Sequence, residues 1–181
     1  MTPVRAAAGK NIKSVMENRN TEYLKGQQEK EAIQWMKKAA EVAEKALCLR
    51  AKCGVVIVKD REIIGKGYNA PPLDDLKNRT CLNEYQLPQK FKYDRTCCMH
   101  AEWRAIIDAL KNNPEKIKGS TLYFTRINED IKHWGKPFCT VCSRLILDIG
   151  IKEVVLPQEK GLCLYKTEEY NKVSYEYIPA D

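Results

Sequence analysis

The chain has 181 residues, of which 44% are hydrophobic and 30% are charged, and its formal net charge is +7 at pH 7. This length and balance fit one water-soluble domain with its own core, and no run approaches the roughly 18 apolar residues that cross a membrane. The first ten residues have too short an apolar segment for a secretory signal, so we expect a cytoplasmic protein with no membrane partner. The basic charge is compatible with a nucleotide or nucleic acid, but lysines spread along a chain usually form no more than a basic surface.

The N-terminal part divides into an extension and a first helix. Residues 1–28 show little apolar periodicity, and we interpret them as an N-terminal extension, partly disordered or packed on the domain surface, with a short helix around residues 12–17. The domain proper is expected over residues 29–181. It begins with a helix over residues 29–48, because apolar residues recur every three or four positions at Ile33, Met36, Ala40, Ala43 and Leu47.

Two strands and a long polar connection follow this helix. Residues 54–59 are apolar and β-branched, Asp60-Arg61 makes a turn, and residues 62–68 return as the second strand. Residues 71–97 are polar and too long for an ordinary connection, which indicates either a functional or a disordered segment.

The second half of the chain alternates helices and strands. Its apolar patterns predict, in chain order, a helix over 100–112, a strand over 119–125, a helix over 139–150 and a strand over 151–156. Residues 173–178 alternate enough to form a fifth strand. One or two helical turns between residues 158 and 172 would make that strand parallel to the fourth, and this is the arrangement we favour.

Two of the predicted helices begin with residues that suit a catalytic zinc site. Cys139 and Cys142 form a Cys-x-x-Cys pair that directs both sulfurs at one point, and His100 opens the other helix. One imidazole and two thiolates leave the fourth tetrahedral position of Zn²⁺ open for water, which is a catalytic rather than a structural arrangement. Glu102, two residues after His100, can then lie beside that water without binding the metal.

The remaining cysteines leave a second possibility open. Cys81, Cys97 and Cys98 could hold a structural zinc ion, with Cys53 as a fourth ligand. No two of them have the Cys-x-x-Cys spacing, and the adjacent Cys97 and Cys98 cannot easily bind one tetrahedral ion. Reduced, partly buried thiols are therefore the simpler interpretation.

The order His-x-Glu, then Cys-x-x-Cys behind a proline, resembles the signature of the cytidine and deoxycytidylate deaminase superfamily. The resemblance covers roughly residues 30–156. It implies a three-layer α/β/α fold with a central mixed five-stranded sheet flanked by helices. It also implies a zinc-dependent hydrolase that removes an amine from a base, with Zn²⁺ on His100, Cys139 and Cys142 and with Glu102 as the catalytic proton carrier.

The resemblance further implies how a substrate would be held. The backbone N–H of Ala101 would orient the base, and Asn69, in Gly-Tyr-Asn, would hydrogen-bond the sugar. Arg50 takes the place of a phosphate-binding arginine, with Lys52 and Arg126 as further candidates. Each has a plainer alternative, since Asn69 suits a turn that caps a strand and each basic residue suits a solvated surface. A homo-oligomer is expected by analogy with relatives.

One stretch departs from the pattern of that superfamily. Residues 126–136 intervene before the cysteine helix, and Phe138 stands where relatives have proline. Trp134 and His133 in this stretch could contact a base, or the stretch is a surface hairpin. The long 71–97 connection favours the deoxycytidylate branch, so we expect conversion of dCMP to dUMP and ammonia. The alternatives are a base within RNA or single-stranded DNA, a free nucleoside or base, and, least favoured, a zinc module without activity.

Overall fold

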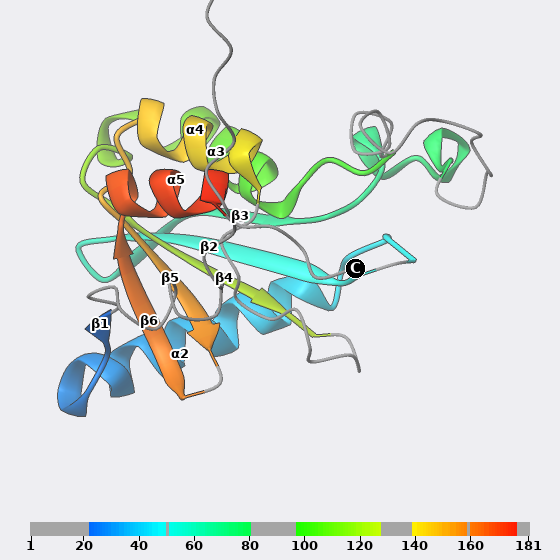
Figure 1. The fold of residues 1–181 in the computed structure, drawn as a ribbon. Helices are drawn as coiled ribbons and strands as arrows, with labels where there is room; N and C mark the ends of the chain where they lie inside the picture. Colours follow the sequence, from blue (N-terminus) through cyan, green and yellow to red (C-terminus); the bar gives the residue numbers. More distant parts are fainter. Residues whose placement is uncertain (1–21, 50, 81–96, 128–138, 159, 177–181) are drawn as a thin grey trace, which may run out of the picture.

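The computed structural model describes residues 22–49, 51–80, 97–127, 139–158 and 160–176. These residues form three layers, in which helix α2 (Gly26–Ala43) covers one face of a mixed sheet and three helices cover the other face (Figure 1). The three helices are α3 (Ala101–Asn112), α4 (Thr140–Asp148) and α5 (Thr167–Glu176). The expected three-layer α/β/α fold is therefore confirmed.

The sheet contains six strands in the described part of the chain, rather than the expected five. They are β1 (Glu22–Tyr23), β2 (Cys53–Lys59), β3 (Glu62–Tyr68), β4 (Thr121–Arg126), β5 (Glu153–Gln158) and β6 (Gly161–Lys166). The order across the sheet is β1-β6-β5-β4-β2-β3, and β4 and β5 are the parallel neighbours, whereas the other described pairs are antiparallel. The β2–β3 hairpin forms as predicted, and it turns at Asp60 and Arg61, both with positive φ, as tight hairpin turns require.

The first helix forms with different limits and a different buried face from those predicted. It begins at Gly26 and ends at Ala43, instead of spanning residues 29–48. Ile33, predicted to face the core, is 40% exposed. The face that packs on the sheet consists mainly of small residues, because the helix lies very close to the strands; its buried members are Ala32, Ala39, Val42 and Ala43.

Two glycines make this close packing possible on both faces of the sheet. A Cβ atom added at Gly54 in β2 would lie 2.1 Å from the carbonyl oxygen of Ala39 in α2. A Cβ atom added at Gly67 in β3 would lie 2.1 Å from the carbonyl oxygen of Ala101 and 2.3 Å from the backbone nitrogen of Ala105, both in α3. Glycine therefore lets the first turn of α3 rest directly on the strand.

The C-terminal part differs from the prediction. Strand β6 pairs antiparallel with β5, and residues 173–176 lie in α5, so the predicted strand over 173–178 and its parallel direction are both wrong. A short connection joins the strands, since Gln158 pairs with Gly161, whose φ of +136° suits glycine. In α5 the buried residues recur at helical spacing, at Thr167, Tyr170, Val173 and Ser174, and this pattern prevails over the strand-like alternation of the last tyrosines.

Some sequence predictions lie on other parts of the chain. Residues 22–28, assigned to the extension, contribute β1 and the start of α2, while the short helix expected around residues 12–17 lies outside the described residues. The start of the 71–97 connection forms two short 3₁₀ turns, Pro72–Asp74 and Leu76–Asn78, and residues 81–96 also lie outside. None of the described helices is long and apolar enough to cross a membrane.

Candidate zinc centre and active site

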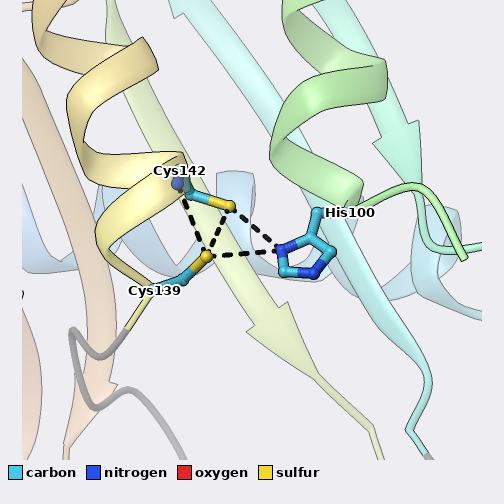
Figure 2. A group of neighbouring side chains, drawn as sticks. All are labelled: His100, Cys139 and Cys142. Carbon is cyan, nitrogen blue, oxygen red and sulfur yellow. Dashed lines mark hydrogen bonds between the residues drawn. The ribbon is translucent and has the colours of Figure 1, made fainter. Parts of the chain in front are cut away.

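Three candidate metal ligands meet where α3 and α4 begin (Figure 2). His100 immediately precedes α3, Cys139 immediately precedes α4, and Cys142 lies in the first turn of α4. The Nδ1 atom of His100 lies 3.1 Å from the Sγ of Cys142 and 3.4 Å from the Sγ of Cys139. The two sulfurs are 3.0 Å apart, so the structure brings the three predicted ligands together.

The local backbone explains this convergence. His100 has extended φ and ψ angles of −68° and 148°, which end the preceding segment and allow α3 to start at the next residue. The Sγ of Cys139 accepts a hydrogen bond from the backbone N–H of Cys142 at 3.4 Å, as an N-cap side chain does. Each ligand is therefore fixed by the same geometry that starts its helix.

The donor set and its spacing fit Zn²⁺. With Zn–S bonds of about 2.3 Å and Zn–N bonds of about 2.0 Å, tetrahedral ligands are separated by roughly 3.5 to 3.8 Å. The separations in the structure are 3.0, 3.1 and 3.4 Å, so the side chains would have to move apart by up to about 0.8 Å to reach those values. No second group of described residues brings three such ligand atoms together. The trio supplies three ligands, so the fourth tetrahedral position stays open for water.

The three candidate ligand side chains shift one another's pKa values, because they lie within hydrogen-bonding distance of one another. The hydrogen bond from Cys142 lowers the pKa of the Cys139 thiol to about 4, and His100 adds to this effect. The same thiolate raises the pKa of His100 to about 9, although burial opposes the rise. The pKa of Cys142 is raised, chiefly by its bond to Cys139. A metal ion bound by these three side chains would take the place of their protons, since imidazole and thiolate groups bind it in deprotonated form.

Glu102 lies beside this trio in the first turn of α3 and is only 7% exposed. Burial raises the pKa of its carboxyl group, and the Cys139 thiolate raises it further, while His100 opposes the change. Glu102 also contributes to the raised pKa of Cys142, which places the carboxylate next to that sulfur. A buried carboxyl with a raised pKa can both accept and donate a proton near neutral pH.

Asn69 and Ala101 lie close to the three candidate ligands, at the end of the sheet where β3 ends and β2 begins. Asn69 follows β3, and Ala70 beyond it accepts a hydrogen bond from the backbone N–H of Met99 at 2.8 Å, directly before His100. The side-chain oxygen of Asn69 accepts from the N–H of Cys53, and its amide nitrogen donates to the carbonyl of Ala51, each at 2.8 Å. Asn69 therefore fastens the segment before β2 to the end of β3. Ala101 is the first residue of α3 and is buried.

Several predicted site residues have no structural description. Arg50, Trp134 and His133 lie outside the described residues, as does Cys81. Cys97 and Cys98 are described, with their sulfurs 3.8 Å apart, and neither forms a disulfide bond with a described cysteine.

Sequence reasoning missed a polar cluster that joins α3 to the end of β3 and the turn after it. The Nη1 of Arg104 lies 2.7 Å from a carboxylate oxygen of Asp74, and the hydroxyl of Tyr68 donates to the other oxygen at 2.7 Å. The guanidinium also lies over the Tyr68 ring, 4.4 Å from its centre. Leu73 and Asp74 both have positive φ, at 58° and 59°. Arg104 is four residues after His100 and so shares its helix face, but no local signal pairs it with a residue thirty positions earlier.

A second missed feature supports the cysteine helix. The hydroxyl of Ser143 in α4 is completely buried and lies 2.7 Å from the hydroxyl of Ser174 and 3.0 Å from the amide oxygen of Asn171, both in α5. Helix α5 therefore holds α4 through buried hydrogen bonds one residue beyond Cys142. Sequence patterns do not reveal this contact, because the alternation over residues 173–178 predicts a strand in place of the end of α5.

A buried glutamate beside one imidazole and two thiolates, each ligand at a helix start on an α/β/α sheet, defines a zinc-dependent hydrolytic deaminase. Residues 29–158 match the model of the cytidine and deoxycytidylate deaminase zinc-binding region, and the chain belongs to this family. This is the class of protein that the fold and the site define.

Individual relatives agree with this assignment. The chain is 35% identical over 127 residues to a deoxycytidylate deaminase of Mycobacterium phage D29, a match that covers 67% of this chain and 89% of that protein. It is 28% identical over 128 residues to a deoxycytidylate deaminase of Schizosaccharomyces pombe, covering 67% of this chain but only 35% of that protein. A cytidine deaminase structure from Burkholderia pseudomallei, 18% identical, superimposes with a TM-score of 0.52 over 76% of this chain and 94% of that chain, and shows the same fold.

Proposed function

We propose that this protein hydrolyses the exocyclic amine of dCMP and so produces dUMP and ammonia. The observation that carries this proposal is the buried carboxyl group of Glu102 beside the three metal ligands. The phage and yeast relatives named deoxycytidylate deaminase support the choice of substrate.

The residues of the chain divide the reaction between them. Zn²⁺, when bound, lowers the pKa of a water molecule and so supplies the nucleophile. Glu102 would accept a proton from that water at a carboxylate oxygen and pass it to ring nitrogen N3, next to the carbon that bears the amine. It would then take a second proton from the hydroxyl group added to that carbon and give it to the amine, so that ammonia leaves as the carbonyl forms. Its raised pKa suits both directions of transfer. The free N–H groups at the start of α3 favour negative charge at this point.

Further residues are proposed to hold the nucleotide. Asn69 contacts the sugar: its amide already makes two bonds to the backbone, but one N–H and one lone pair remain. The backbone N–H of Ala101 orients the base, Arg50 contributes a positive charge for the phosphate, and Trp134 stacks on the base.

We also propose that the protein is a homo-oligomer. Large apolar side chains of α3 and α4 are exposed: Ile107 is 41% exposed and Leu110 47% exposed on α3, and Val141 is 44% exposed on α4. A second copy would remove this apolar area from water. Light scattering coupled to gel filtration measures the mass, and a purely monomeric protein at micromolar concentration would contradict the proposal.

A cytoplasmic location is proposed as well. The seven described cysteines form no disulfide bond, as expected for a reducing compartment. Fractionation of cells that express the protein tests this location.

The activity is tested with the zinc-loaded protein and a panel of substrates. Ammonia release is measured with dCMP, CMP, deoxycytidine, cytidine, cytosine and short single-stranded RNA and DNA. We expect dCMP to give the highest kcat/KM. The variant Glu102→Gln keeps the size of the side chain, and we expect it to be inactive. If only a polynucleotide is deaminated, the substrate is a base inside a polymer and not dCMP. If no compound is deaminated, the proposed enzymatic activity is rejected.

A further inference from the structure

Arg126, the last residue of β4, lies on the sheet face that carries the zinc centre. Side chains at alternate positions of a strand share a face, so Leu122, Phe124 and Arg126 point the same way. Leu122 is buried in one cluster with residues of α3 and α4, and Phe124 packs against it. Arg126 is paired directly with Cys53 of β2, which packs against the same cluster.

The surroundings of Arg126 connect it to the active site. Burial raises the pKa of Cys53 to about 12, and Glu102 adds to this rise while Arg126 opposes it, so Cys53 lies within electrostatic reach of both. The backbone N–H of Ile127 donates to the carbonyl of Lys52 at 3.0 Å, which fastens the end of β4 to the segment before β2. Asn69, which follows β3, hydrogen-bonds the backbone of the same segment at Ala51 and Cys53. Arg126 therefore lies at the sheet edge where the catalytic residues converge.

The guanidinium group of Arg126 has no partner among the described residues. Its Nε atom is shielded from solvent and makes no hydrogen bond, and the side chain takes part in no ion pair of the described chain. Arg104 provides a contrast, since it is paired with Asp74. The Nε of Arg79 is also buried without a partner, but its guanidinium group already has an acceptor, because Nη2 donates to the carbonyl of Leu47 at 2.6 Å. A buried N–H without an acceptor is unfavourable, and in native structures such a group calls for a ligand.

We propose that Arg126 binds the phosphate group of the nucleotide substrate and so makes the enzyme select nucleotides over nucleosides. This inference rests on the proposed deaminase function. A guanidinium group stays charged at all relevant pH values, and its fork of N–H donors matches two phosphate oxygens. A neutral nucleoside offers no group of comparable charge, so Arg126 discriminates through the phosphate alone.

The test compares dCMP with deoxycytidine in matched variants of the zinc-loaded enzyme. Arg126→Gln keeps hydrogen-bonding capacity but removes the charge, and we expect kcat/KM for dCMP to fall about 10- to 100-fold. The value for deoxycytidine should change by less than about threefold, since it lacks the phosphate. Arg126→Lys keeps the charge without the fork and should give an intermediate loss. Arg61→Gln is the control, because Arg61 is an exposed arginine in the β2–β3 turn.

Each outcome bears on the inference. Equal losses on dCMP and deoxycytidine, or no loss on dCMP, would overturn the role in phosphate binding. A selective loss on dCMP supports it. If the wild-type protein does not deaminate dCMP, the proposed function fails, and binding of dUMP and inorganic phosphate by calorimetry decides the inference separately. Binding weakened at least tenfold in Arg126→Gln alone would retain Arg126 as a phosphate ligand, and unchanged or absent binding would reject it.

Discussion

Replacing Gly67 by alanine should displace the catalytic helix without altering any catalytic side chain. Gly67 lies in β3 under the first turn of α3, and its missing side chain leaves room for the helix backbone. The new Cβ atom would lie 2.1 Å from the carbonyl oxygen of Ala101, between His100 and Glu102 in the sequence. Backbone atoms cannot move aside as a flexible side chain can, so the whole turn must retreat.

The size of the effect follows from this distance. Cβ contacts shorter than 3.0 Å essentially do not occur, so the turn must move by about 1 Å. Overpacking of this kind destabilises proteins by about 1 to 3 kcal/mol, or roughly 2 to 12 °C in Tm for a chain of this length. A 1 Å displacement of catalytic groups can reduce turnover about 100-fold. We therefore expect a moderate loss of stability together with a large loss of kcat.

The matched control lies on the other face of the same sheet. A Cβ atom added at Gly54 would also lie 2.1 Å from a backbone oxygen, that of Ala39, but this atom belongs to α2. Gly54→Ala should lower Tm by a similar amount and leave kcat within about threefold of the wild type. Thermal unfolding, zinc content and initial rates with dCMP are measured on both variants at a temperature where both are folded. Equal kcat values for the two variants, at equal loss of stability, would refute the argument that Gly67 positions the active site.

Further predictions concern the proton carrier, the metal and the strained turn. Glu102→Gln should reduce kcat at least about 100-fold while zinc content, measured by atomic absorption, stays at the wild-type level; loss of zinc would mean that Glu102 is a ligand. Removing zinc with a chelator should lower Tm and abolish turnover, and added Zn²⁺ should restore both. In the chelated protein the raised pKa of His100 stabilises the fold below pH 6.5 and is lost towards pH 9, whereas the lowered pKa of Cys139 stabilises it at high pH and is lost towards pH 4. These two effects cancel between pH 6.5 and pH 9, and below pH 6.5 the raised pKa of Glu102 opposes the rise that Cys139 produces, so the test uses Glu102→Gln. Urea unfolding of the chelated Glu102→Gln protein should show stability that rises from about pH 4 to about pH 6.5 and then levels off to pH 9, and adding Cys139→Ser should remove the rise. Leu73→Asn should stabilise the protein by about 0.5 to 1 kcal/mol, because Leu73 has a φ of 58° and is 93% exposed, and a lower Tm would show that its side chain has a contact to lose.

The sequence was most informative where one short stretch determines both a local structure and its chemistry. Cys139 and Cys142 are three residues apart at the start of one helix, so helix geometry places both sulfurs on a common side. His100 and Glu102 are only two residues apart, and they reach one site because His100 is the extended residue before α3 while Glu102 lies in its first turn. The β2–β3 hairpin was equally predictable, because its apolar strands flank a two-residue turn.

Prediction failed where distant segments decide the structure. The pairing of Arg104 with Asp74 depends on how the connection after β3 folds back on α3, and no periodicity reports that. The buried face of α2 was misjudged because its alanines face a glycine of β2, and the pattern of large apolar residues pointed elsewhere. The last tyrosines alternate like a strand, yet packing of Tyr170 and Ser174 against the neighbouring elements makes the segment a helix.

The pairing of β1 with β6 has a practical consequence for handling the protein. The two residues of β1, followed by a hydrogen bond from the N–H of Leu24 to the carbonyl of Leu162, cover the outer edge of β6. A version trimmed to residues 29–158, the region that matches the family, would lose β1, β6 and α5 together. Strand β5, with Val154, Val155 and Leu156 fully or almost fully buried, would then become an apolar edge with unpaired backbone groups. Such an edge recruits strands from other molecules, so the trimmed version should aggregate even though it retains every candidate zinc ligand.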